Sequence, residues 1–378
     1  MSSSTTRHTL KLVSDPKQIK EFLAFPYRHY KEDKYWVAPL RMEQKKLIDK
    51  SNNAFFQQAV MEMVLIWKDD QIAGRIAAVI DHRYNEHHDT KTGFFGFFES
   101  DNHPETARLL FKMAEDHLRR QGMTNIIGPA NPGIMDTLGF LVDGFDKYPS
   151  ILMPYTKPYY PELAEACGYK KEMDLITFEV NQDNVDRDRV NRAMNIVQQR
   201  LPGIKIRKIR KKKLAEELVI VREIFNKAWS KNWGFVPLTE AEFEQLGKDL
   251  KPVINENFAH IAEIDGQPVG FSVGIPDYNQ ILRDMDGRLL PFGIFHLLFK
   301  RNRINQIRTA LMGVIPEYQG KGIDALLHRE TIEYGKENGY YASEVGWILE
   351  SNVQMLRVAE RIGGVKDKVY RVYGKSLD

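Results

Sequence analysis

The chain has 378 residues, of which 43% are hydrophobic, and it carries a formal net charge of +3. One hydrophobic core stops growing at about 250–300 residues, so we expect two domains. The small net charge does not suggest the broad basic face of a nucleic-acid-binding protein, and the single cysteine, Cys167, excludes a disulfide framework within the chain.

The sequence also lacks the patterns of secretion and of a membrane span. Its first ten residues, MSSSTTRHTL, contain no apolar run typical of a secretory signal. An apolar stretch, LLPFGIFHLLF, ends at Phe299 but is far shorter than the ~18–20 residues of a transmembrane helix. Together with the lone cysteine, which favours a reducing compartment, these features predict a cytoplasmic protein without a membrane partner.

In the N-terminal half, the stretch 63–81, MVLIWKDDQIAGRIAAVID, predicts a strand, a tight polar turn and a second strand. A further strand and a helix are predicted over Phe95–Gly122, since apolar residues recur in the helical part at positions i, i+3, i+4, i+7 and i+8. The residues on that buried face are Leu110, Met113, Ala114, His117 and Leu118. We therefore expect His117 at the edge of a core rather than in a ligand site.

The predicted helix begins in the stretch Asn102–Ala107, NHPETA, which contains no glycine. Pro104 and Glu105 are typical of a first helical turn. His103 has the residue type of a general base, but a surface residue that precedes a helix is the commoner case.

A loop-rich insertion, Gly128–Tyr155, follows and contains several glycines and prolines. Loops of this length inside compact domains are often functional. In one interpretation it covers an acceptor cleft, where Asp136 and Asp143 contact an amine. In the other it is a packing loop.

The polar stretch Asn181–Ile204 is partly helical in pattern and ends in Pro202-Gly203, which predicts a domain boundary. The basic run Lys205–Lys213, KIRKIRKKK, comes next. Because isoleucines alternate with charged residues at its start, we expect a strand with one solvated face rather than a nucleic-acid patch.

The C-terminal half repeats the N-terminal one. The stretch 258–277 matches 63–81 and contains Asp265-Gly266, a strong hairpin-turn signal. Met312–Gly339 aligns with Phe95–Gly122 without a gap, and 362–375 aligns with 167–180. Each half is predicted to contain a strand, a helix, a hairpin, a strand, a helix, a strand, a helix and a strand, with one insertion at a different place in each.

A glycine-bearing turn distinguishes the C-terminal half. The apolar strand IRTALMGVI ends at Pro316, and Gln319-Gly320-Lys321-Gly322 precedes a helix predicted from about Ile323 to Gly335. The first N–H groups of a helix lack internal partners and carry partial positive charge, so this turn could hold a pyrophosphate. Asp324 stands where such a site would prefer no negative charge.

The turn resembles the acyl-CoA loop of the GNAT superfamily of N-acyltransferases. Val314-Ile315-Pro316 precedes it, and Gln319, Gly322 and Asp324 occupy the three marked places of the family's Gln/Arg-x-x-Gly-x-Gly/Ala pattern. Downstream, Asn352 and Gly363 flank a predicted helix, as in that family. The resemblance covers about 200–378 and extends, without the loop, to about 8–180, so the whole chain resembles a tandem-GNAT protein.

This resemblance implies an α/β (α+β) fold with two GNAT-like domains in tandem, each a mixed, mostly antiparallel sheet flanked by helices. The implied partition is an N-terminal domain over 1–185, a linker over 186–203 and an acyl-CoA-binding domain over 204–378. The strand at 313–315 would contact the pantetheine arm, 319–324 would wrap the pyrophosphate, and Asn352 would bind the arm. The implied cofactor-binding residues are Gly313, Val314, Ile315, Gln319, Gly320, Lys321, Gly322, Ile323, Asp324 and Asn352.

The implied activity is transfer of an acyl group, acetyl in the first instance, from acetyl-CoA or another acyl-CoA to the amine of a small molecule, with no metal. Two residues depart from the family pattern. Asp324 replaces Gly or Ala, and Ala359 stands where a tyrosine acid is common. Tyr318, Tyr370 and Tyr373 are the substitutes considered for that acid, and the catalytic residues stay unassigned.

Two alternatives remain beside the enzyme. A catalytically lapsed GNAT pair could bind acyl-CoA or serve as a scaffold, and the departures at Asp324 and Ala359 favour it. An aminoacyl transferase that uses charged tRNA could share the doubled fold. Such an enzyme is expected to have a broad basic face for the tRNA, which a net charge of +3 does not suggest. The sequence predicts neither the acceptor nor the oligomeric state.

Overall fold

The computed structural model describes residues 7–291 and 293–378 and contains two compact units. The first residues, Met1–Thr6, where no secretory signal is expected, lie outside the described part. The N-terminal unit takes the chain up to Asp174 together with Leu282–Gly293 and Val369–Asp378. The C-terminal unit consists of Leu175–Ile281 and Ile294–Lys368.

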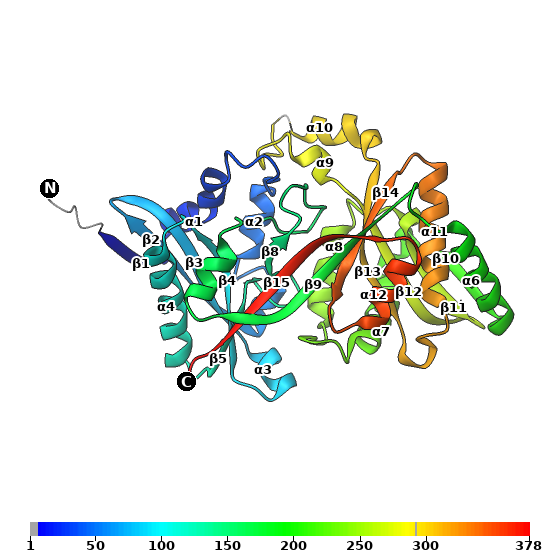
Figure 1. Ribbon diagram of the computed structural model, residues 1–378, viewed down its shortest axis with the longest axis horizontal. Coiled ribbons are helices and arrows are strands. Elements are labelled where there is room, and N and C mark those ends of the chain that lie inside the picture. Colours follow the sequence, from blue (N-terminus) through cyan, green and yellow to red (C-terminus); the bar gives the residue numbers. More distant parts are fainter. Residues whose placement is uncertain (1–6, 292) are drawn as a thin grey trace. The chain divides into compact units, whose positions relative to one another are not determined.

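The N-terminal unit is a sheet flanked by helices (Figure 1). Its strands follow the order β1-β2-β3-β4-β5-β15, and within it only the β4–β5 pair is parallel. The strands that belong to it wholly are β1 (His8–Leu12), β2 (Ala59–Lys68), β3 (Gln71–Asp81), β4 (Thr92–Ser100), β5 (Asn125–Gly128), β6 (Ala130–Asn131), β7 (Thr137–Leu138) and β8 (Phe140–Asp143). The helices are α1 (Pro16–His29), α2 (Arg41–Leu47), η1 (Ala54–Gln57), α3 (His82–His88), α4 (Pro104–Arg120) and α5 (Tyr160–Ala166).

The C-terminal unit repeats this arrangement, with the order β9-β14-β13-β12-β11-β10 and one parallel pair, β13–β14. Its strands are β10 (Ile204–Lys208), β11 (Ala259–Ile264), β12 (Gln267–Pro276), β13 (Gln306–Val314) and β14 (Ala342–Leu349). Its helices are α6 (Arg187–Arg200), α7 (Leu214–Trp229), α8 (Glu240–Leu250), α11 (Ile323–Glu337) and α12 (Val353–Arg361), with short turns η2 (Lys211–Lys213), η3 (Glu256–Phe258), η4 (Arg301–Arg303) and η5 (Pro316–Tyr318). Two more helices, α9 (Asn279–Leu282) and α10 (Gly293–Lys300), bracket the segment that joins the other unit.

The last strand of each half completes the unit of the other half. From Leu175 onward, β9 (Lys170–Asn181) pairs with β14 of the C-terminal unit. The end of β15 (Val365–Ser376) pairs with β5 of the N-terminal unit, where Tyr373 lies opposite Gly128. The two strands are equivalent in the repeat, so each sheet receives a strand of the expected pattern from the other half. The division of the chain into domains at 1–185, 186–203 and 204–378 stays a prediction. It does not include the exchange of β9 and β15 between the two halves.

The predicted fold class is confirmed, since each sheet is mixed, mostly antiparallel and flanked by helices. The predicted turn at Asp265-Gly266 joins β11 to β12 with positive φ at both residues, 50° and 80°. Among the described residues, no helix is long and apolar enough to cross a membrane.

The apolar stripe predicted on α4 lies in the core of the N-terminal unit. Leu110, Ala114 and Leu118 are fully buried there, beside Phe111. His117 lies at the edge of the stripe, where its Nδ1 is 2.8 Å from Glu62 Oε1. The core-edge interpretation of this histidine is therefore confirmed.

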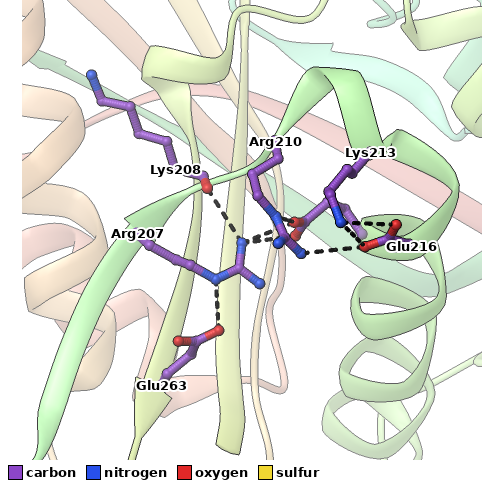
Figure 2. A network of polar contacts seen from close by, with 7 residues as sticks. Arg207, Lys208, Arg210, Lys213, Glu216 and Glu263 are labelled. Atoms are coloured by element: carbon purple, nitrogen blue, oxygen red, sulfur yellow. Dashed lines mark hydrogen bonds and ion pairs between the residues drawn. The ribbon is translucent and has the colours of Figure 1, made fainter. Parts of the chain in front are cut away.

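Arg207, Arg210 and Lys213 of the basic run pair with neighbouring carboxylates (Figure 2). The Arg207 Nε donates to Glu263 Oε1 at 2.6 Å, and its Nη1 donates to Glu217 Oε2 at 2.9 Å. Arg210 also pairs with Glu217, whose side chain is fully buried. These pairs fasten β10 to β11 and α7, which favours a structural role for the run.

Candidate active site

The strands β13 and β14 pair only at their beginnings. Their parallel register runs from Gln306 opposite Ala342 to Thr309 opposite Val345. Beyond this point β13 continues to Val314, paired with β12 on its other side. Within the described residues, the edge of β13 from 310 to 314 therefore has no neighbouring strand on the β14 side. A strand edge of this kind offers main-chain donors and acceptors to an extended ligand.

The helix α7 lies against this open part of β13. The Trp229 Nε1 donates to the Met312 carbonyl at 2.8 Å. A Cβ added to Gly313 would lie 3.0 Å from the Cβ of Ala228 and 3.0 Å from a ring carbon of Phe271. Glycine at 313 therefore lets the helix approach the strand closely, which is a packing reason for this predicted site residue.

The predicted glycine turn follows directly after η5 and leads into α11 (Figure 1). Gly320 and Gly322 have φ angles of 71° and 86°, in the left-handed region that glycine adopts most readily. The Gln319 Nε2 donates to the Val314 carbonyl at 2.9 Å and closes the turn onto the end of β13. Within the described part of the chain, the N–H groups of Gly320 and Gly322 donate no hydrogen bond.

Two charged residues of the predicted set, Lys321 and Asp324, lie beside this turn. Lys321 is exposed, with its Nζ 4.6 Å from the ring centre of Tyr318. Asp324 is half-buried in the first turn of α11. Burial raises the pKa of its carboxyl, while the N–H groups of Asp324 and Ala325 lower it. Burial is the larger effect, so the pKa of this carboxyl is raised overall, and Ile323 beside it is buried in the core.

Asn352 is the N-cap of α12. Its Oδ1 accepts a hydrogen bond from the Met355 N–H at 3.1 Å, which supplies one of the partners that a helix start lacks. This capping hydrogen bond is by itself a sufficient reason for an asparagine at position 352, whether or not a ligand contacts it. Its proposed contact with a pantetheine arm stays a prediction.

None of the tyrosine positions offers a clear acid. Ala359 is only 1% exposed, within the core of the C-terminal unit. Tyr370 and Tyr373 belong to the N-terminal unit and are fully buried, and the Tyr373 hydroxyl donates to Glu165 at 2.8 Å. Tyr318 is the one of the three candidates that lies beside the glycine turn.

A buried charged cluster lies where β13 and β14 begin to diverge. The Lys368 Nζ donates to Glu344 Oε2 at 2.9 Å and also pairs with Asp367. All three residues are less than 8% exposed. Arg308, also buried, is the register partner of Glu344 on β13. Burial alone would lower the pKa of Lys368, but the two carboxylates outweigh it and raise the pKa, so Lys368 is an ammonium at neutral pH.

No motif in the sequence predicts this cluster. The available signal was the presence of charged residues inside apolar strand patterns, such as Arg308 in IRTALMGV and Glu344 in ASEVGWIL. Charged residues are rarely fully buried unless they are paired, so such positions mark a polar site inside a core.

A small pocket of about 30 Å³, partly open to solvent, lies in the C-terminal unit and is lined by residues of β9, α11, β13 and β14. His328 lines it and is 4% exposed, and its Nε2 has no hydrogen-bond partner in the described part of the chain. Burial lowers the pKa of His328 to about 4, so the ring is neutral near pH 7. The pocket walls also carry the hydroxyls of Thr309 and Ser343, which are 3.3 Å apart.

The corresponding place in the N-terminal unit is filled. The β4–β5 pair also ends early, with Phe94 opposite Ile127. There, however, the Asn131 Oδ1 accepts a hydrogen bond from the Phe97 N–H at 2.5 Å. A Cβ at Gly96 would lie 1.9 Å from the Ala130 carbonyl oxygen, which shows how closely the chain after β5 packs on β4. This unit therefore leaves no open edge on β4 at that point.

The helix α4 starts at the stretch without glycine that the sequence shows. Pro104 is the first helical residue and His103 is the N-cap, without a side-chain hydrogen bond to the helix. The insertion 128–155 contributes buried residues to its own unit, among them Phe140 and Leu141. This burial favours the packing interpretation of the insertion.

A further polar network lies inside the N-terminal unit. The hydroxyls of Tyr30 and Tyr160 donate to Glu99 Oε2 at 2.5 and 2.7 Å, and Arg75 lies 3.6 Å from Glu99 Oε1. The Tyr160 hydroxyl also lies 2.9 Å from His29 Nε2. Burial raises the pKa of Glu99, and Arg75 and the tyrosine hydroxyls oppose it. The network connects α1, β3, β4 and α5, and its internal pairing indicates a structural role.

The fold and the turn define the class of protein. Residues 218–364 match the family model described as "Acetyltransferase (GNAT) family". Over the whole chain, the tandem GNAT protein from the clavulanic acid biosynthesis pathway has a similar structure, with a TM-score of 0.56, 11% identity and 99% of each chain covered. The chain belongs to the GNAT family of acyltransferases, with two GNAT-like units.

Two full-length relatives give a more specific comparison. The chain is 35% identical over 373 residues to the bacterial ceramide synthase of Caulobacter vibrioides, covering 97% of this chain and 96% of the relative. It is 36% identical over 367 residues to protein YghO of Escherichia coli, covering 95% and 93%. At this coverage, the matches extend over both halves of the chain.

Proposed function

We propose that this protein transfers an acyl group from acyl-CoA to the amine of a long-chain amino alcohol and forms an amide. The observation that carries the proposal is the open edge of β13 followed at once by the glycine turn in the C-terminal unit. The same place in the N-terminal unit is filled by Asn131, so one acyl-CoA site per chain is expected.

The residues of the C-terminal unit fit acyl-CoA. The N–H groups of Gly320 and Gly322 are available at the start of a helix, where partial positive charge favours phosphate. Lys321 adds an exposed ammonium beside them. The Val314 N–H on the open edge would donate a main-chain hydrogen bond to the pantetheine arm, since the Ile315 N–H donates to the Val269 carbonyl and the Val314 carbonyl accepts from Gln319. The predicted cofactor-binding set, including Gln319, is kept here as part of the proposal.

The choice of acceptor rests on the relative named a ceramide synthase. A ceramide is the N-acyl derivative of a long-chain amino alcohol, so its formation from acyl-CoA is acyl transfer to an amine. Because that relative spans both halves of this chain, we propose the same acceptor class and a long-chain acyl group. Acetyl transfer to a small polar amine is the alternative from the wider family, and a cytoplasmic location agrees with either.

For the proton transfers we propose the pair Glu344 and Lys368. The reaction needs a base that takes a proton from the attacking ammonium and an acid for the leaving thiolate. Glu344, on β14 one rung before the pairing with β13 ends, is an acceptor, and Lys368 on β15, which donates to it, is protonated near neutral pH. Glu344→Gln should then lower kcat about 10²–10⁴-fold while the acyl-CoA dissociation constant changes little.

The rival function is an acyl-CoA-binding pair without catalysis. It is favoured by the carboxylate of Asp324 at the helix start and by the buried methyl group of Ala359. An enzyme is the better account, because the chain matches a family of acyltransferases and a full-length relative named as a synthase.

The deciding experiment incubates the full-length protein with acyl-CoA thioesters of increasing chain length and two acceptors, sphinganine and a small polyamine. Mass spectrometry detects the amide, and a thiol reagent measures released CoA. We expect amide only with a long acyl chain and sphinganine. Gly322→Glu, which places a charged side chain in the turn, should abolish product. CoA binding without any amide, across all pairs, would favour the rival.

A further inference from the structure

The insertion of the C-terminal half carries an exposed apolar helix face. On α10, the side chains of Phe295, Leu298 and Phe299 are 51%, 67% and 79% exposed. Their spacing of three and four residues places them on one face of the helix, and the rings of Phe295 and Phe299 stack with centroids 6.4 Å apart. Contiguous exposed apolar residues of this size mark an interaction surface.

Positive charge borders this face. Arg301 and Arg303 follow in η4, are exposed, and form no ion pair within the described residues. Lys300 is the last residue of α10. From Gly287 to Pro316 the sequence contains no aspartate or glutamate. The charged residues of this stretch of sequence are therefore all basic.

We propose that this face of α10, with Arg301 and Arg303, docks the protein onto an anionic phospholipid bilayer. A helix of eight residues is about 12 Å long, far less than the hydrocarbon core, so α10 would lie in the interface and not span it. A short apolar face flanked by basic residues is the pattern of interfacial helices, in which the apolar side chains enter the acyl region and the cations meet lipid phosphates.

Charge complementarity selects the bilayer over a second copy of the chain. Two copies joined through this face would bring the basic residues of both together, and the segment carries no carboxylate to pair with them. An anionic membrane supplies the missing negative charge. The inference depends on α10 and η4 and not on the proposed acceptor, so either can fail without the other.

The test measures sedimentation of the full-length protein with phosphatidylcholine vesicles, with and without phosphatidylglycerol, in the absence of any substrate. We expect binding to the anionic vesicles that weakens as salt is added, since salt screens the attraction between exposed charges. The double variant Leu298→Glu/Phe299→Glu should weaken binding about tenfold or more, because it removes the inserted apolar side chains and adds repulsion. Circular dichroism should show an unchanged fold, since both side chains are exposed.

Two controls locate the effect. Val219→Glu places the same charge on an exposed apolar position of another helix, α7, and should leave vesicle binding unchanged. Arg301→Glu/Arg303→Glu should remove the preference for anionic over neutral vesicles. Hydrogen exchange with anionic vesicles should slow over residues 293–303 and not over α7.

Three results would overturn the proposal. One is equal vesicle binding by the wild type and the α10 double variant. Another is no binding to anionic vesicles at all. The last is a wild-type protein that is a dimer in sedimentation velocity and does not bind vesicles, together with a double variant that is a monomer. This result would assign the face to contact with a second copy of the chain.

Discussion

Val197 of α6 lies directly against Gly322 at the start of α11. A Cβ added to Gly322 would lie 2.6 Å from Val197 Cγ2, a distance that real side chains do not adopt. Gly322 also has a φ of 86°, which L-residues with a Cβ rarely adopt. The helix after the domain boundary therefore helps to shape the turn in which acyl-CoA is proposed to bind, and α6 lies beside α11 in Figure 1.

Gly322→Ala should weaken acyl-CoA binding about tenfold or more, because the methyl group displaces Val197 and strains the backbone of the turn. Isothermal titration calorimetry measures the effect. The matched control is Gly339→Ala, since Gly339 has a φ of 78° but a Cβ there would meet nothing within 4 Å. The control should lose stability without losing affinity. Equal affinity of both variants and the wild type would mean that the turn does not hold the ligand.

If the Asp324 carboxylate points away from the phosphates, Asp324→Asn should leave the dissociation constant of acyl-CoA nearly unchanged. It should not lower the stability near pH 7, because burial raises the pKa of the Asp324 carboxyl and the folded chain therefore disfavours its charged form. Glu317→Gln removes one charge from the exposed turn η5 nearby and is the control for net charge. If Asp324→Asn instead tightened binding tenfold or more, worth ~1.4 kcal/mol, the carboxylate would face the phosphates. That result would support the non-catalytic rival.

The free energy of unfolding should fall as the pH is lowered from about 6.5 to about 4. Burial lowers the pKa of both His260 and His328 to about 4, so over this window the unfolded chain binds more protons than the folded one. The stability that each neutral histidine contributes is therefore fully present above the pKa of that histidine in the unfolded chain. This contribution is lost as the pH falls toward its pKa in the folded chain. His328→Leu should reduce the loss between pH 7 and pH 5 by about 2 kcal/mol in urea titrations. An unchanged pH dependence in His328→Leu would show that the ring is not buried as a neutral group.

The strand exchange predicts how fragments behave. A fragment over 204–378 lacks the part of β9 that pairs with β14, and it carries the end of β15, whose partner β5 is absent. It should aggregate, because open strand edges template association. A fragment over 175–368 keeps the β9–β14 pair and ends where the C-terminal unit ends, so it should be the more soluble of the two. Size-exclusion chromatography compares them, and a monodisperse 204–378 fragment would argue against the exchange.

Much of the fold could be predicted because the repeat is visible in local patterns. The Asp265-Gly266 turn and the stripe through Leu110 depend on neighbouring residues in the sequence, and both occur as expected. The exchange of β9 and β15 could not be foreseen, since the two strands have equivalent patterns and either one suits either sheet.

Only part of the candidate site could be predicted from the sequence. The turn at Gly320 and Gly322 is a local motif, and its positive φ angles agree with the sequence. The cluster of Glu344 and Lys368 joins residues distant in sequence, and only the folded chain brings them together. For Asn352 the sequence motif does not distinguish between two roles, because the same position fits both a contact with acyl-CoA and a helix N-cap.

The most direct measurement of the central claim is a calorimetric titration of the full-length protein with a long-chain acyl-CoA, beside Gly322→Glu. The account predicts one site per chain, because β13 has an open edge and a glycine turn whereas Asn131 fills the equivalent place on β4. The variant should show no binding. Two sites per chain, or binding by Gly322→Glu equal to the wild type, would contradict it.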